Sequence, residues 1–443
     1  MPNTDPYWIS ILPAPIRNRL VGRVNLHAIV HNSGWLLLDK FARIFFGVLV
    51  GAWVARYLGP DAYGEVAYAL AYLAFFQVAV SLGLDGIVVR ELSKYPTQGG
   101  RILGTVFFMR LGVGIFSWIL SVGGLMVVNG WQDKSVLLVL IAGSALIFQP
   151  ADTIDLWFQS QSQSRRTVIA KSSAYVISNG IRVVLLLCQA SLIWFVLVVA
   201  IDAMIAAVAL AFIYRQSKSN VRWLWSSNLA KTLLAETWPY AVSSLAVMVY
   251  MRFDQILIRG ILGSKDLGLY AAMLPLSTVW NMLPTVICTS VAPLIARKKA
   301  ENESEYYKVL LFVFRSFLVA SLSLSVVIAM LSPLIVKTLY GSAYMGSSKI
   351  LAIHIFTNVP VFLGVAQSLW FTNENRAGVM LRNTLLGGCV ALVANYYLLP
   401  ILGVEGAAIS AVLSFFTSGV LLNVFGAREV FLMQIGIDVR KFK

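Results

Sequence analysis

The sequence is poor in charged residues and in long polar segments. Only 12% of its 443 residues are charged, whereas 58% are hydrophobic. Soluble domains carry roughly 25% charged residues, so this composition argues against a soluble globular protein. The connections between the apolar runs are also too short to hold a folded catalytic domain, and we therefore expect no enzyme activity.

Cysteine and the usual chemical motifs are scarce as well. The three cysteines, Cys188, Cys288 and Cys389, each lie within an apolar run and form no CxxC pair. This spacing predicts neither a disulfide framework nor a metal site. No Walker, HExxH, GxSxG or GxGxxG motif occurs in a plausible context, so we expect no cofactor and no ATP-driven transport by this chain alone.

Long apolar runs fill most of the chain, which has a mean hydropathy of +0.78. Each run is close to the roughly 20 residues that a helix needs to cross a bilayer. We therefore predict an all-α polytopic membrane protein with about twelve spans. The expected spans are residues 35–57, 63–84, 104–128, 136–158, 170–189, 192–214, 238–261, 267–296, 309–331, 350–371, 379–399 and 405–425.

The spans fall into two groups of six around a polar connector, and a short pattern recurs. Leu58–Gly64 follows the first span, Leu262–Gly268 follows the seventh, and a third copy, Leu402–Ala408, precedes the last. Glycine turns are common between helices, but two groups of six spans favour a duplication. The expected divisions are an N-terminal cytoplasmic segment (1–33), an N-lobe (34–214), an amphipathic connector on the membrane surface (215–236), a C-lobe (237–427) and a cytoplasmic tail (428–443).

The distribution of Lys and Arg predicts the orientation. Cytoplasmic loops are enriched in these residues, and most of the 35 lie in the N-terminal segment, the even-numbered connections and the tail. Both termini are therefore expected in the cytoplasm. The net charge of +15 follows from this topology and does not indicate a nucleic-acid partner. The cations on the opposite side are only Arg56, Lys134, Arg259, Lys265, Lys337 and Lys349.

Charged residues inside the spans are the strongest functional signal, because a charge facing lipid is costly and normally faces a cavity or a partner. Arg252 and Asp254 lie deep in the seventh span, and two residues on a helix point about 200° apart, so each needs its own partner. The other expected substrate-binding residues are Arg43, Arg182, Arg110, Arg315 and Lys40. The expected charge partners or coupling residues are Asp254, Asp39 and Asp202.

Structural explanations compete with these assignments. Asp39 and Arg43 have the spacing of an ion pair within one helix, and Lys40, Arg110 and Arg315 lie close enough to a helix end to reach the interface. Asp254 could instead bind a neighbouring helix. His354 has the context of a buried, hydrogen-bonded histidine rather than a proton relay.

Several motifs resemble those of the Wzx-type O-antigen flippases, the polysaccharide-transport branch of the MATE-like (MOP) exporter superfamily. The likeness extends over nearly the whole chain and is most specific around the seventh span. The residues that carry it are Met251–Leu257, Leu262–Ala272, Trp280–Pro284, Ser290–Pro293, Asn395–Ala408, Arg56–Gly64 and Leu84–Gly86.

This resemblance implies a V-shaped bundle of two six-helix lobes in the bacterial inner membrane. It implies a flippase that moves undecaprenyl-diphosphate-linked oligosaccharides to the periplasmic leaflet, with Arg252 and Asp254 as functional residues. Membrane lipids and this substrate are the expected partners, and a polysaccharide polymerase and a chain-length regulator are further partners that the resemblance allows. A cation-coupled MATE-type drug exporter and a flippase for lipid II or a teichoic-type glycan remain alternatives.

Overall fold

The computed structural model describes the backbone of residues 24–217 and 222–439, and side chains within these ranges from Phe46 onward. All regular elements in these ranges are helical. The α-helices are α2 (Val24–Ser81), α3 (Asp85–Lys94), α4 (Gly99–Asn129), α5 (Lys134–Gly143), α6 (Ala145–Phe148), α7 (Asp152–Ser160), α8 (Ser164–Leu187), α9 (Leu192–Gln216), α10 (Ser227–Ile261), α11 (Ser264–Thr278), α12 (Met282–Glu301), α13 (Glu303–Tyr340), α14 (Gly346–His354), α15 (Asn358–Asn373), α16 (Ala377–Leu402), α17 (Val404–Gly419) and α18 (Arg428–Gln434).

Short 3₁₀ segments join several of these helices within a single membrane span. Helices α11 and α12, for example, continue one another through η4 (Val279–Asn281) and together correspond to the eighth predicted span. The others are η2 (Pro96–Gln98), η3 (Gln149–Ala151), η5 (Ser342–Tyr344), η6 (Ile355–Thr357) and η7 (Leu421–Phe425).

Eleven helical stretches of the described residues are long and apolar enough to cross a membrane. They match the twelve predicted spans except at the start, where one stretch, Phe46–Lys94, contains the described part of the first span together with the second. This stretch holds two helices that meet at Gly59, where the backbone is non-helical (φ 76°, ψ 166°), a conformation open to glycine, so the break predicted between the first two spans is present. Gly263 (φ 95°) and Gly403 (φ 62°) occupy the same place in the other two copies of the repeat.

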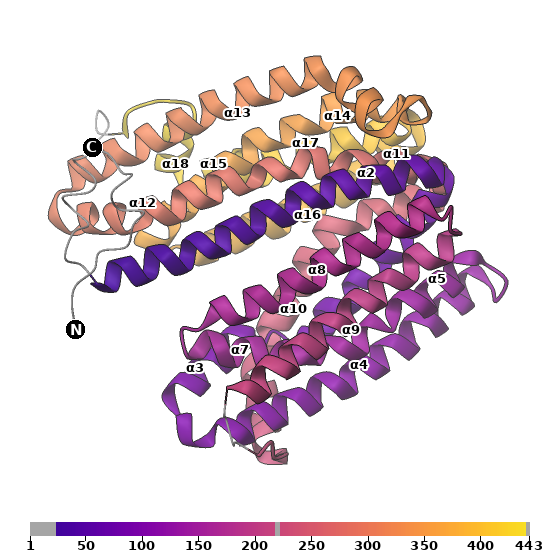
Figure 1. Ribbon diagram of the computed structural model, residues 1–443. Helices are drawn as coiled ribbons and strands as arrows, with labels where there is room; N and C mark the ends of the chain where they lie inside the picture. The colour runs from indigo at the N-terminus through magenta and orange to yellow at the C-terminus, as the bar shows by residue number, and fades with distance from the viewer. Residues whose placement is uncertain (1–23, 218–221, 440–443) are drawn as a thin grey trace.

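The helices form two lobes that meet at one end of the molecule and diverge toward the other, where the described chain begins at Val24 and ends at Val439 (Figure 1). The N-lobe contains α2–α9 and the C-lobe contains α11–α18. The largest hydrophobic core joins the lobes, because Ala52 and Leu73 of one and Tyr270 and Tyr344 of the other belong to it. At the divergent end the two lobes have separate cores. We call these the joined end and the open end.

The two copies of the repeat pack on each other at the joined end. A Cβ atom added to Gly64 would collide with the carbonyl oxygen of Ser264, and one added to Gly268 would collide with that of Pro60. The contact is reciprocal, since Gly64 and Gly268 hold equivalent positions in the repeat. This symmetric contact supports the duplication and explains why both positions are glycine: only a residue without a side chain lets the backbones approach so closely.

Large hydrophobic side chains cover much of the outer surface. Val127, Leu187 and Met330 are more than three-quarters exposed, at 86%, 80% and 77%. A soluble protein would bury such residues, whereas a bilayer solvates them. The surface therefore agrees with a multi-pass membrane protein.

Two of the predicted segments, the connector and the tail, contain helices that pack on the lobes. The second half of the connector, residues 227–236, forms the first turns of α10 and packs on the N-lobe through Leu233, which shares a core with Leu84 and Leu103. The tail begins with α18, which packs against the core of the C-lobe at the open end. Burial of Val430 and Met433 holds this helix in place.

Candidate functional site

Helix α10 connects the two lobes and carries the charges singled out in the sequence. It begins at an N-cap, Ser226, whose hydroxyl accepts a hydrogen bond from the backbone N–H of Leu229 at 3.4 Å. Its first turns are held to the N-lobe by an ion pair of 2.6 Å between Arg90 and Glu236. Farther along, Tyr250 packs edge-on against Phe415 of the C-lobe, with ring centroids 5.1 Å apart.

Asp254 is bonded inside the C-lobe and does not pair with Arg252. The buried hydroxyl of Tyr270 donates to one carboxylate oxygen at 2.5 Å, and the backbone N–H of Gln255 donates to the other at 2.8 Å. Tyr270 could have been found from the sequence, because Asp254 and Tyr270 lie equally far on either side of the turn at Leu262. Residues placed in this way face each other in an antiparallel helical hairpin.

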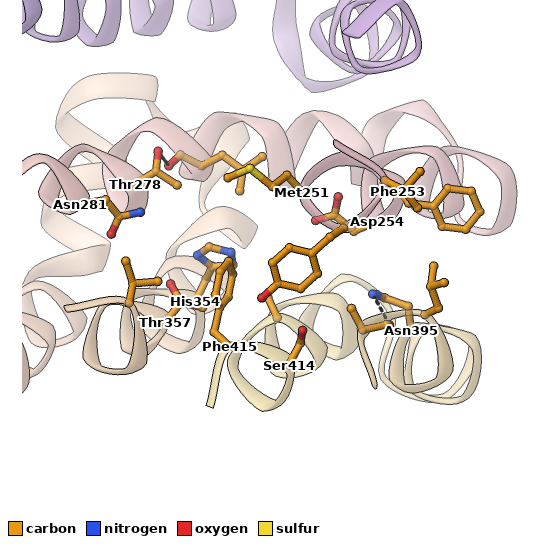
Figure 2. A pocket seen from close by; sticks show the side chains of 17 residues that line it. Met251, Phe253, Asp254, Thr278, Asn281, His354, Thr357, Asn395, Ser414 and Phe415 are labelled. Atoms are coloured by element: carbon orange, nitrogen blue, oxygen red, sulfur yellow. Dashed lines mark hydrogen bonds between the residues drawn. The ribbon is translucent and has the colours of Figure 1, made fainter. Parts of the chain in front are cut away.

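A small cavity lies beside Asp254 within the C-lobe. Its volume is about 90 Å³, and its polar lining includes Asn281, Thr357, Asn395 and Ser414. Figure 2 shows these side chains arranged around the cavity together with Asp254. These side chains come from helices that are far apart in the sequence, so no local sequence motif predicts that they line one cavity.

His354 also lines this cavity and is hydrogen-bonded. Its Nδ1 lies 2.8 Å from the hydroxyl of Ser277, and the Asn358 amide donates to the Ser277 carbonyl at 3.0 Å. The prediction of a buried histidine with a satisfied hydrogen bond is confirmed.

Arg252 has an exposed side chain and forms no ion pair or hydrogen bond with the residues that the structure describes. Arg259 lies seven residues farther along α10, and this spacing returns a helix to nearly the same face. Because Arg259 reaches across to Glu65 of the N-lobe at 3.0 Å, Arg252 occupies the face of α10 that is turned toward the N-lobe. The two residues are separated by about 10 Å along the helix axis.

The ion pair between Arg259 and Glu65 is part of the contact between the lobes. The same Glu65 oxygen accepts a hydrogen bond from the hydroxyl of Ser264, and the Arg259 guanidinium lies 5.7 Å from the centre of the Tyr68 ring. The sequence analysis placed Arg259 outside the membrane core and overlooked this pair. The available signal was the position of Glu65 directly after one copy of the repeat and of Ser264 within the other.

The other predicted site residues whose side chains the structure describes form no direct bond with Arg252 and have other partners. Arg110 is only 2% exposed and forms an ion pair of 2.5 Å with Asp85. Arg182 donates to the side-chain oxygen of Asn179 at 3.1 Å.

Asp202 and Arg315 likewise have nearby partners. Asp202 accepts a hydrogen bond from Ser178 at 2.7 Å, and Arg315 donates to the carbonyl of Gly436 at 2.7 Å. The substrate or coupling roles of Arg110, Arg182, Arg315 and Asp202 remain predictions. Asp39, Lys40 and Arg43 lie outside the described side chains.

The architecture defines a helical multi-pass membrane protein with two lobes connected by α10. Residues 29–299 match the polysaccharide biosynthesis protein family, and the chain belongs to that family. It is 20% identical over 378 residues to the "Putative O-antigen transporter" of Shigella dysenteriae, covering 85% of this chain and 94% of that protein. An "Uncharacterized membrane protein" of Haemophilus influenzae is 22% identical over 61% of this chain and 66% of its own length.

Solved structures share the fold. A multidrug resistance MATE family transporter of the MOP superfamily in an inward-facing conformation gives a TM-score of 0.70 at 13% identity, covering 90% of this chain and 99% of that chain. The lipid II flippase MurJ in an inward closed conformation gives 0.67 at 12% identity, covering 90% and 89%. An outward-facing MATE transporter gives 0.60 at 13% identity, covering 92% and 96%.

These comparisons confirm the predicted family resemblance, the all-α MATE-like fold and the multi-pass bacterial membrane location. The family and its structural neighbours are transporters and flippases rather than enzymes, as the sequence predicted. The cytoplasmic location of both termini stays a prediction.

Proposed function

We propose that this protein is a flippase for undecaprenyl-diphosphate-linked oligosaccharides, the repeat units of a surface polysaccharide such as O-antigen. It moves the head group from the cytoplasmic to the periplasmic leaflet of the inner membrane while the lipid tail stays in the bilayer. Family membership and the similarity to a protein named as an O-antigen transporter support this proposal. In the predicted orientation, the open end faces the cytoplasm.

The observation that carries the proposal is the unpaired Arg252 on the side of α10 turned toward the N-lobe. A diphosphate that leaves water needs fixed hydrogen-bond donors, and a guanidinium supplies planar, charge-assisted donors that match its oxygens. The ordinary structural role of an intramembrane arginine is to pair with an acid, and Arg252 has no such partner among the described residues. It is therefore available to a ligand between the lobes.

The membrane potential favours this direction of transport. An outward movement of negative charge across an inside-negative membrane is favourable by about 2.3 kcal/mol per charge per 100 mV. The joined end then has to open, which breaks the Glu65–Arg259 contact, while the open end closes. Alternating access of this kind releases the head group to the periplasm.

Asp254 is the residue that we propose for coupling. Its carboxylate lies beside a polar cavity and is held by a hydroxyl and a backbone N–H rather than by a cation. A proton or a small monovalent cation at this position would compensate its charge. The state of this site could then alter the packing of α10 on the C-lobe.

The test is replacement of Arg252 by Ala and by Lys in a strain whose surface polysaccharide depends on this protein. We expect Arg252→Ala to abolish surface polysaccharide at normal protein levels and Arg252→Lys to restore part of it, because lysine keeps the charge but loses the planar donors. Arg222→Ala, at an exposed arginine of the connector, is the matched control. Full activity of Arg252→Ala would overturn the proposal.

The same strains separate the alternative substrates. A lipid II flippase would be required for growth rather than for surface polysaccharide, and a MATE-type exporter would confer resistance to cationic drugs independently of Arg252. A polysaccharide polymerase and a chain-length regulator are the proposed partners, since they act on the unit after it has crossed. Cross-linking in cells that contain all three proteins tests this association.

A further inference from the structure

A second polar site lies at the open end of the C-lobe, away from α10. It is a cavity of about 440 Å³ between the ends of α13 and α15 and the segment from η7 to α18. The side chains that define its chemistry are Tyr307, Trp370, Glu374, Arg376, Arg428 and Glu429. The function proposed above does not use any of them.

The cavity presents two uncompensated arginines. Its two acids already have protein partners, because Lys299 pairs with Glu374 at 2.5 Å and the hydroxyl of Tyr307 donates to Glu429 at 2.6 Å. Arg376 and Arg428 are both exposed, and neither forms an ion pair with an acidic side chain of residues 46–217 and 222–439. Two free guanidinium groups at the mouth of a cavity favour an anion with several oxygen atoms.

A buried donor adds to this preference. Trp370 is 4% exposed, and its indole N–H has no acceptor among the described residues although the side chain lines the cavity. A buried donor without an acceptor is costly, and a ligand oxygen would remove that cost after a small adjustment. The cavity therefore offers a neutral donor as well as two cations.

The surroundings favour an anion that is carried by a lipid. Phe425 lines the same cavity and is 79% exposed, and its neighbour Val424 is 42% exposed. An exposed aromatic residue next to unpaired arginines is typical of the membrane interface, where apolar atoms meet acyl chains and cations meet head groups. A soluble anion would gain nothing from this apolar rim.

The walls of the cavity are fixed by buried hydrogen bonds. The Asn423 amide donates to Gln367 at 2.7 Å, and the Gln434 amide donates to the Gly419 carbonyl at 2.7 Å. These bonds connect η7 and α18 to α15 and to the end of α17. Arg315 donates a hydrogen bond to the carbonyl of Gly436, just beyond α18. The two arginines therefore lie beside segments that buried hydrogen bonds hold in place.

We propose that this cavity binds the phosphate of an anionic lipid in the leaflet at the open end, with Arg376 and Arg428 as its charged ligands and Trp370 as an additional donor. Both a glycerophospholipid and a polyprenyl phosphate carry this chemistry. The site is separate from Arg252, so the inference holds whether or not the protein moves an oligosaccharide. Its occupation would fasten α18 and η7 to the membrane surface.

Native mass spectrometry of the purified full-length protein tests the proposal. The lipids to be titrated are phosphatidylglycerol, undecaprenyl phosphate and, as the zwitterionic comparison without net charge, phosphatidylcholine. We expect the double variant Arg376→Gln/Arg428→Gln to bind at least one of the two anionic lipids about ten-fold or more weakly than the wild type. Phosphatidylcholine binding should not change, and the lipid whose binding falls identifies the natural source of the phosphate.

The matched control is Arg215→Gln/Arg222→Gln, which removes two exposed arginines from the N-lobe side and should bind like the wild type. Arg376→Lys/Arg428→Lys keeps the charge and should give intermediate affinity, which distinguishes loss of the site from misfolding. The proposal is overturned if the first double variant binds both anionic lipids like the wild type. It is equally overturned if the control pair loses as much affinity.

Discussion

Arg252 and Asp254 are neighbouring charged residues on α10 that lie in different surroundings. Their separation of about 200° around α10 directs Asp254 into the C-lobe and Arg252 toward the N-lobe. Asp254 finds a tyrosine hydroxyl and a backbone N–H, while Arg252 remains unpaired within the described part of the chain. One helix thus carries both a residue of the polar site inside the C-lobe and an unpaired cation that faces the N-lobe.

The bond between Asp254 and Tyr270 allows charge and hydrogen bonding to be tested separately. We expect Asp254→Asn to lose transport at a small cost in stability, because the amide oxygen still accepts from the tyrosine but the amide NH2 group cannot accept from the Gln255 N–H. Tyr270→Phe should lower the free energy of unfolding by about 1.5–3 kcal/mol, the usual size of a hydrogen bond to a charged group. Surface polysaccharide and thermal unfolding in detergent are the two measurements. Normal transport by Asp254→Asn would exclude a coupling role.

Residue partners were the least predictable part of the site. The sequence indicated that Arg110 and Arg315 were buried or near an interface, but their partners come from other segments, Asp85 and Gly436. No periodic pattern in a single helix reveals such contacts. Tyr270 was the exception, because the symmetry of a hairpin about its turn links it to Asp254.

At the scale of helices the sequence was a good guide, since apolar runs of bilayer length are a strong signal. What it missed were features set by packing between helices. The early end of α17 at Gly419 and the existence of α18 belong to this group, whereas the break at Gly59 between the first two spans was predicted. The amides that hold α18, Asn423 and Gln434, lie in a segment that looked like a simple helix end.

The glycine contact between α2 and α11 gives a second prediction. A methyl group at position 64 cannot fit against the Ser264 carbonyl, so we expect Gly64→Ala to separate the lobes at the joined end. Spin labels at the exposed positions 61 and 265 should report longer distances by pulsed electron resonance. Gly51→Ala is the control, because a Cβ there meets open space. Unchanged distances in Gly64→Ala would show that this contact does not set the conformation.

At the scale of the molecule, the duplication explains where the lobes meet. The two copies of the repeat contact each other reciprocally, and one hydrophobic core crosses the interface only at that end. The backbones approach closely in this region because Gly64 and Gly268 carry no side chain. The polar component of that region is the Glu65–Arg259 pair, which must break whenever the joined end opens.

The Glu65–Arg259 pair allows the stability of the joined end to be tested. Its side chains are only 14% and 25% exposed, so loss of one partner leaves a largely buried charge, as in Glu65→Gln or Arg259→Gln. We expect either change to shift the equilibrium about ten-fold toward separation of the joined end, which corresponds to about 1.4 kcal/mol. The labels at positions 61 and 265 measure this shift.

The exchange Glu65→Arg/Arg259→Glu decides whether the pair acts through charge. It restores an opposite-charge contact across the lobes, although Ser264 and Tyr68 no longer meet the groups that they contact now. We therefore expect the double variant to recover much of the closed population that each of Glu65→Arg and Arg259→Glu loses alone. If the double variant is as open as the sum of the single changes, the pair is a bystander, and the backbone contact between the two repeats alone holds the lobes together.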